Sequence, residues 1–283
     1  MAPPADKSLY PFVLTATVAG GDLAEQTKAV KEKLTSAGFE VVGEVTPYEN
    51  TNIVVATNDQ LKEIASKTDF GAYGAGVRVA ITKVKDEVQV SFASPTYFGG
   101  AYRMNGDLET VTRAVTACLA ADEAQVKEFG MEKGMTWAEL NKYHYKTGMP
   151  YFDEPMILAT YGSYKEACDK LEENFAAKKD GVHKVYRIDI PGKEETVFGV
   201  RMTGGTYHDT KIMTEIDFKP LKSSAHLPYE VVVKEGKVYA LSAKFRIAIS
   251  FPDLSMVGSH SFASIMSCPN SIKKHLGNAC SAK

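Results

Sequence analysis

Apolar and polar residues follow one another along the chain in an order that occurs twice. In the first series, the apolar residues of 23–34 recur at helical spacing and Gly38 ends the helix. The segments FEVVGEVTPY and TNIVVATN then have the composition of strands, and Asn58 is placed to cap a second helix, DQLKEIASK. A hairpin that turns at Lys85-Asp86 and a helix in DLETVTRAVTACLA complete the series.

The second series repeats this order from residue 162 onward. A helix in SYKEACDKLEENF, two strands, a helix in YHDTKIMTEI and a hairpin that turns at Glu235-Gly236 follow one another. The segment HSFASIMSCPNSIKKHL is predicted to be helical with a break at Pro269. KTDF ends the inner helix of the first series and EIDF ends that of the second, so the pattern indicates an internal repeat.

We therefore expect an α+β fold of two related units, each an antiparallel sheet with helices packed on one face, arranged as a pseudo-dimer. The first unit is predicted over residues 22–120, and the second, with a C-terminal helix, over 161–283. Residues 121–160 belong to neither copy and are predicted to form a helical connector, with a short helix around 137–145.

Part of this pattern resembles a known family. KLEENFAAKKDGVHKVYRIDIPGK, VFGVRM, IDF and LPYEVVVKEGKVYALS, within residues 163–256, are similar to the domain-of-unknown-function 302 family of small bacterial and archaeal domains. Residues 23–104 follow the same pattern but lack the Leu-Pro before the hairpin. The resemblance implies the α+β fold of each unit, and it brings no activity to any residue.

Charge and composition exclude some classes of function. The net charge is −2, so no global field favours nucleic acid, and no apolar stretch has the length of a membrane span. Residues 2–5, Ala-Pro-Pro-Ala, are similar to the first residues that a signal peptidase leaves. We expect an exported, periplasmic protein whose leader is not in this chain; a cytoplasmic protein with a Pro-rich N-terminus is the alternative.

The cysteines Cys118, Cys168, Cys268 and Cys280 form an even set without C-x-x-C spacing, which disfavours zinc ribbons and thioredoxin-like sites. The surroundings of Cys168 predict a buried packing residue. If the protein is exported, a disulfide between Cys268 and Cys280 is a further expectation. The pairing of the four remains open at this point.

The segment GAYGAG, residues 71–76, has the glycine content of a phosphate loop but the wrong neighbours. Phosphate loops follow a strand and open a helix, whereas this segment follows a helix and precedes a strand. The pattern therefore predicts a helix cap and turn.

Two strand-to-helix segments are better oriented for a ligand, SFASPTYFGGAYRMNG and SFPDLSMVGSHS. If the two segments converge in a groove between the units, Arg103, Asn105, Ser259 and His260 would supply polar contacts and Tyr102 an apolar wall. The ligand would then be small and anionic or aromatic. Ordinary helix capping is the competing interpretation of both segments.

The connector contains the segment YHYKTGMPYFDEPM, in which Tyr143, His144, Tyr145, Met149 and Met156 lie close together. Histidine with methionine suits copper, but packing across a domain interface is the favoured interpretation, so no metal ligand is assigned. A cluster of exposed tyrosines here would also suit a protein partner.

Motifs for catalysis are missing, since the chain has neither G-x-S-x-G nor H-E-x-x-H. We predict no catalytic residue and assign no cofactor. The favoured hypothesis is a non-enzymatic binding or accessory protein with a small ligand between the units. Two alternatives stay open: a subunit or scaffold of a larger assembly, and a metal-binding protein or cysteine-dependent enzyme.

Overall fold

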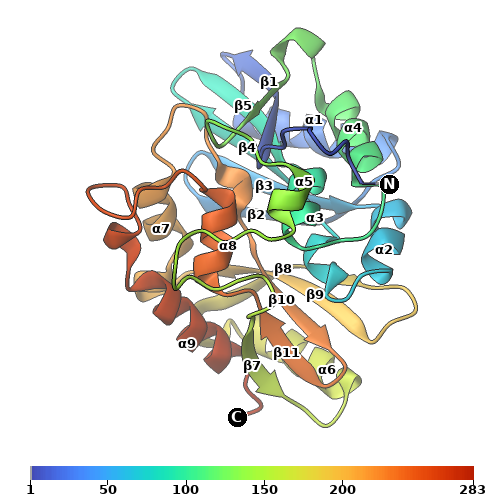
Figure 1. The fold of residues 1–283 in the computed structure, drawn as a ribbon, viewed down its shortest axis with the longest axis vertical. Coiled ribbons are helices and arrows are strands. Elements are labelled where there is room, and N and C mark those ends of the chain that lie inside the picture. Colours follow the sequence, from blue (N-terminus) through green and yellow to red (C-terminus); the bar gives the residue numbers. More distant parts are fainter. Residues whose placement is uncertain (1) are drawn as a thin grey trace.

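A computed structural model describes residues 2–283, and within them the strands form two antiparallel sheets (Figure 1). The first sheet has six strands in the order β2-β3-β4-β5-β1-β6. Its strands are β1 (Phe12–Ala19), β2 (Glu40–Tyr48), β3 (Thr51–Thr57), β4 (Val77–Val84), β5 (Glu87–Ala93) and β6 (Lys127–Phe129).

The second sheet has five strands in the order β7-β11-β10-β9-β8 within the described residues. Its strands are β7 (Met156–Thr160), β8 (Val182–Asp189), β9 (Glu195–Met202), β10 (Tyr229–Lys234) and β11 (Lys237–Ala240). Without β6, the order of the first sheet is the same, because β2, β3, β4, β5 and β1 correspond to β8, β9, β10, β11 and β7.

The helices repeat in the same way. α1 (Leu23–Ser36), α2 (Asp59–Ser66), α3 (Pro95–Ala101) and α4 (Leu108–Leu119) belong to the first unit, and α6 (Tyr164–Ala176), α7 (Asp209–Ile216), α8 (Ala243–Ser250) and α9 (Cys268–Cys280) take the equivalent places in the second. The short helix α5 (Trp137–Leu140) lies in the connector. The predicted fold class, two α+β units with antiparallel sheets, is confirmed.

The structure adds one strand to the start of each predicted unit. β1 lies before residue 22, where it pairs with β5, and β7 lies before residue 161, where it pairs with β11. The connector also contributes β6 to the first sheet, where Phe129 pairs with Phe12. Each unit is therefore a strand, a helix, two strands, a helix, a hairpin and two helices.

Local signals account for many element boundaries. The side chain of Asn58 accepts a hydrogen bond from the N–H of Leu61, 2.8 Å away, which confirms the predicted cap of α2. Both hairpins turn where predicted, with Lys85 and Glu235 at a φ of 54°. The predicted break in this segment lies just before Pro269, at residues 266–267, between the 3-10 turn η6 (Ala263–Ile265) and α9, whose first turn contains the proline because a missing N–H costs nothing there.

The two units meet through equivalent elements, as the halves of a two-fold dimer do. The edge strands β2 and β8 lie against each other, and a Cβ at Gly43 would be only 2.3 Å from the carbonyl oxygen of Val185. The equivalent helices α3 and α8 also touch, because the Tyr97 hydroxyl donates to the carbonyl of Ile249 at 2.8 Å.

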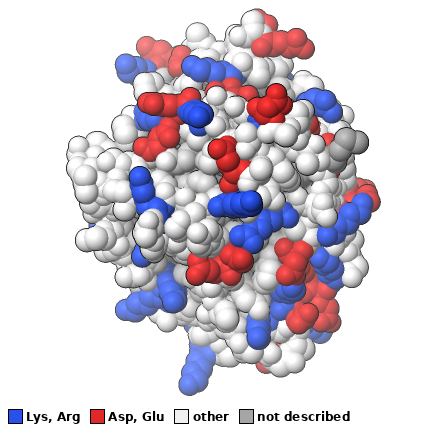
Figure 2. Space-filling model, viewed as in Figure 1, with Lys and Arg blue, Asp and Glu red and all other residues white. Residues whose placement is uncertain are grey.

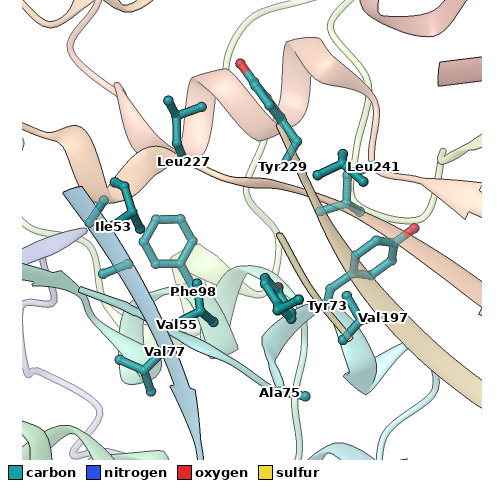
Figure 3. Packing of buried hydrophobic residues seen from close by; sticks show 14 of the residues in the cluster. Ile53, Val55, Tyr73, Ala75, Val77, Phe98, Val197, Leu227, Tyr229 and Leu241 are labelled. Atoms are coloured by element: carbon teal, nitrogen blue, oxygen red, sulfur yellow. The ribbon is translucent and has the colours of Figure 1, made fainter. Parts of the chain in front are cut away.

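Buried side chains from both units form one interior. Figure 3 shows Val55, Val77 and Phe98 of the first unit in the same packed region as Val197 and Tyr229 of the second. The two units thus share one core, and each sheet turns one face toward the other unit. The helices α1 and α4 pack on the sheet of the first unit, and α6 and α9 pack on that of the second.

The glycine segment 71–76 is part of this junction. It forms the 3-10 turn η1 (Gly71–Gly74) after α2, which confirms the prediction of a turn, and it packs on β9 and β10 of the other unit. The Ala72 N–H donates to the Glu195 carboxylate at 3.0 Å. The equivalent turn η5 (Ser224–His226) packs in return on β3, β4 and β5. Each unit therefore places the equivalent loop against the sheet of the other unit.

Candidate binding site

A cleft of about 550 Å³ lies at one edge of the junction between the units. One wall is β6 with the connector residues that follow it, and the other is the end of α7 with the loops 217–223 and 251–260 of the second unit. Most of the lining is apolar, with the rings of Phe129, Phe218 and Phe251. A concave, largely apolar cavity of this size is typical of small-molecule sites.

His260 is held in a fixed orientation at the rim of the cleft. Its Nδ1 lies 2.8 Å from the carbonyl oxygen of Glu215 and donates a hydrogen bond to it, and its ring packs on that of Phe218 with 4.9 Å between centroids. Because Nδ1 is occupied as a donor, Nε2 of the neutral ring is an acceptor for a ligand. Ser259 also lines the cleft.

Acidic and basic side chains both line the cleft, but they differ in whether other groups of the protein already hydrogen-bond to them. The Asp217 carboxylate accepts the Ser223 N–H at 2.8 Å, and Asp253 accepts the Glu132 N–H at 2.6 Å. Lys127 and Lys219 are exposed along the lining. The ammonium groups are therefore better placed than the two hydrogen-bonded aspartates to meet a ligand, while the exposed Glu132 is the third carboxylate of the lining.

Burial controls the ionisation of Asp217. Desolvation raises its pKa to about 6, while the Ser223 N–H, the charge of Lys222 and the Ser224 hydroxyl act in the opposite direction. The carboxyl group fixes the 217–223 loop, since it holds Ser223 from within the loop. It thus positions one wall of the cleft.

The structure brings two of the five predicted site residues into this cleft. Ser259 and His260 line it, whereas Arg103 is bonded to Asp153 of the connector at 3.0 Å. Tyr102 is fully buried in the core, and the Asn105 backbone N–H donates to Thr68. The prediction that the five side chains form one site is not what the geometry shows.

The five side chains do not converge because the two strand-to-helix segments fold differently from each other. The segment PTYFGGA, expected as part of a loop, is helix α3, with Ser94 as its N-cap and Pro95 in its first turn. The second segment does the opposite: residues 258–261, expected to open a helix, form turns in which Ser261 bonds to Gly258. The two segments therefore end in different surroundings.

No motif in the sequence selects the other cleft residues. Phe129, Phe218 and Lys219 come from a connector strand and from the segment after an inner helix, which are not loops between a strand and a helix. The sequence shows only that Phe218 repeats Phe70, and the structure then shows that Phe218 is 48% exposed. An exposed aromatic residue beside a cavity is a useful indicator of binding.

The connector packs inward. The Tyr143 hydroxyl donates to the Ala248 carbonyl at 3.0 Å and that of Tyr145 to the Leu254 carbonyl, while His144 stacks on Tyr151 with 4.1 Å between ring centroids. This arrangement fits the expected packing role. Within residues 2–283, three or more His, Cys, Asp or Glu side chains never come together as a metal site.

The cysteines are all free thiols in the described chain. Cys268 and Cys280 begin and end the same helix, α9, so the disulfide expected between them is wrong. The twelve helical steps from one to the other place them about 18 Å apart, far beyond the reach of a disulfide. Burial raises the pKa of Cys168 and Cys268, the opposite of what activates a nucleophilic thiolate.

Charges of both signs are interspersed over the face of the molecule that Figure 2 shows, in agreement with the net charge of −2. A helix with the length and apolarity to cross a membrane is not found among residues 2–283.

Comparisons with known proteins give one structural match. No protein-family model matches the chain, and no curated protein matches it. The match is the crystal structure of an uncharacterized conserved protein DUF302 from Bacillus stearothermophilus, with 16% identity and a TM-score of 0.33, over 37% of this chain and 94% of that chain. The match spans little more than a third of this chain and brings no activity to it.

Proposed function

We propose that the protein is a non-enzymatic binding protein, and that its cleft between β6 and α7 takes a small aromatic ligand with an acidic group. The cleft carries this proposal, since it combines a volume of about 550 Å³ with walls from both halves of the chain. Export to the periplasm stays a prediction from the N-terminal residues.

The lining suits each part of such a ligand. Phe129, Phe218 and Phe251 offer ring faces and edges on which a flat ligand can stack. Lys127 and Lys219 provide positive charge for the acidic group, and His260 adds an oriented ring nitrogen. Because Phe218 and Lys219 are neighbours in the chain, the stacking surface and the charge lie together.

The anionic aromatic dye 1-anilinonaphthalene-8-sulfonate is a suitable probe, because its fluorescence rises in apolar sites. We expect saturable binding to the native protein that Lys219→Glu weakens by about fivefold, the equivalent of about 1 kcal/mol for a partly exposed charge pair. Lys237→Glu makes the same change of charge on β11, outside the cleft lining, and should bind the dye as the wild type does. Equal binding by both variants would exclude the cleft.

One observation favours a second candidate function, a subunit of a larger assembly. Val257 and Met266 are each 76% exposed, and Met256 is 40% exposed, on the loop region that follows α8. Neighbouring exposed apolar side chains are typical of a protein contact. Light scattering on native material separates the two candidate functions. An oligomer that Val257→Lys dissociates would support the assembly subunit, whereas a strict monomer would oppose it.

A further inference from the structure

The interior between the two units contains a buried ionic cluster. Arg78 of β4 donates from Nη1 to Oε1 of Glu230 on β10 at 2.6 Å and from Nε to the Ala225 carbonyl at 2.7 Å. Arg246 of α8 donates from Nε to the other oxygen of Glu230 at 2.8 Å. All three charged side chains are nearly inaccessible to solvent.

His226 completes the cluster without adding charge. Burial, and then the guanidinium groups of Arg246 and Arg78, hold its pKa far below the ordinary value. The neutral ring accepts at Nδ1 from Arg246 at 3.0 Å and donates from Nε2 to the Tyr229 hydroxyl at 3.0 Å. Two guanidinium charges against the one carboxylate of Glu230 therefore leave one positive charge in the core.

Three buried polar atoms near this cluster lack a hydrogen-bond partner among the described residues. Within residues 2–283, Nη2 of Arg78 and the hydroxyl oxygens of Tyr73 and Tyr102 are buried and have no partner in hydrogen-bond geometry, although Arg78 lies close enough to Tyr102 to act against the rise that burial causes in the pKa of its hydroxyl. Arg246, in contrast, uses all of its guanidinium nitrogens. Buried donors without partners are rare in folded proteins, because each costs its full desolvation energy.

The three atoms belong to neighbouring side chains. The rings of Tyr73 and Tyr102 lie 6.1 Å apart, and Phe98 contacts both Tyr102, with 6.1 Å between centroids, and the Arg78 guanidinium, 4.6 Å from its ring. Figure 3 shows Tyr73 and Phe98 at this junction. Burial raises the pKa of the Tyr73 hydroxyl, and the charge of Glu230 raises it further.

We propose that Arg78 Nη2 and the hydroxyls of Tyr73 and Tyr102 bind one small monovalent anion of the size of chloride in the interior between the units. A buried positive charge without a counter-charge is costly, and an anion here removes that cost while it accepts hydrogen bonds from all three donors. Glu195, the next buried carboxylate, is engaged by the Ala72 N–H and also faces Lys193 and Lys234.

A crystal grown in bromide gives the direct test. Bromide replaces chloride and scatters anomalously, so the expected result is an anomalous peak at hydrogen-bond distance from Arg78 Nη2 and the two tyrosine hydroxyls. Density for a water molecule without an anomalous signal would overturn the proposal, and so would a direct hydrogen bond among the three groups.

A solution experiment tests the same site in the full chain. An anion that binds only the folded state stabilises it in proportion to the logarithm of its concentration above the Kd. We expect the melting temperature to rise as chloride replaces gluconate at constant ionic strength, and Tyr102→Phe and Tyr73→Phe to weaken this dependence. Tyr143→Phe removes a buried hydroxyl that is bonded to Ala248 and should keep it. A wild-type melting temperature independent of chloride would contradict the site.

Discussion

Arg78 and Glu230 form an ion pair across the centre of the molecule, with 2.6 Å between Nη1 and Oε1 and 152 residues between them in the chain. Each lies on the first strand of its unit's hairpin, β4 or β10. The side chains are 4% and 2% exposed, so the pair is formed inside the interface of the two units. Separation of the two units would leave each charge buried without its partner. The ion pair therefore couples the stability of one unit to that of the other.

Replacement of Glu230 by Gln should destabilise the protein strongly. The variant leaves Arg78 and Arg246 as buried charges without a carboxylate, and such losses cost about 3–5 kcal/mol. Glu44→Gln breaks a more exposed pair with Lys31, in which both side chains are 39% exposed, and should cost less than about 1 kcal/mol. Urea unfolding followed by circular dichroism measures both, and similar costs would contradict a buried role for Glu230.

The contact between β2 and β8 depends on a missing side chain. A Cβ at Gly43 would meet the Val185 carbonyl oxygen at 2.3 Å, so we expect Gly43→Ala to destabilise the protein by about 1–3 kcal/mol as the strands move apart. Gly277 on α9 has nothing within 4 Å of its ideal Cβ, and Gly277→Ala should stabilise by about 0.5–1 kcal/mol because alanine favours the helix. Equal effects of the two changes in thermal melts would count against the close approach of the strands.

Asp209 and Asp217 should contribute less to stability as the pH rises from about 4 to 7, whereas the buried, neutral His226 contributes in the opposite direction. Burial raises the pKa of Asp209 to about 7, against the Met202 N–H and the charge of Arg201, and burial raises that of Asp217 to about 6. In this range the folded state holds protons that the unfolded state has released, so the contribution of these groups is full below the unfolded pKa and is lost as the pH rises through the folded values.

The replacement Asp209→Asn identifies the group responsible. The amide keeps the shape of the protonated carboxyl group and cannot ionise, so the free energy of unfolding of the variant should rise relative to that of the wild type as the pH increases from about 5 to 7. Asp253→Asn, at an exposed position, leaves both buried groups intact and is the matched control. A pH dependence of Asp209→Asn identical to that of the wild type would refute the assignment.

All four cysteines should react as thiols. With 5,5′-dithiobis(2-nitrobenzoate), we expect Cys118, which is half-buried, to react first in the native protein, and Cys168, Cys268 and Cys280 only after denaturation. The unreduced, denatured protein should therefore release four equivalents of the thiol product. Two equivalents would show that a disulfide exists and would contradict the four free thiols of the structure.

The sequence predicted the repeat because its local signals are strong. Helical spacing, the cap at Asn58 and the turns at Lys85 and Glu235 act within a few residues, and each holds in the structure. The strands β1 and β7 were left out because their partners, β5 and β11, are distant in the chain. The alternating segment FVLTATVA could have been recognised as a strand without that pairing.

The site was less predictable, because it depends on how the units pack. Arg103 and His260 follow equivalent helices, yet the first binds the connector and the second lines the cleft. The ionic cluster had a signal that was not used, since Arg78 interrupts the apolar run VRVAI and Glu230 interrupts YEVVV. A charged residue within an apolar strand indicates a buried partner, but only the packing identifies it.

The central claim is that the two units share one interior, from which both the cleft and the ionic cluster follow. Differential scanning calorimetry of the wild type and of Glu230→Gln tests it most directly. The account predicts one unfolding transition whose calorimetric and van't Hoff enthalpies agree, and which shifts as a whole to lower temperature in the variant. Two separate transitions in the wild type, of which Glu230→Gln moves only one, would contradict it.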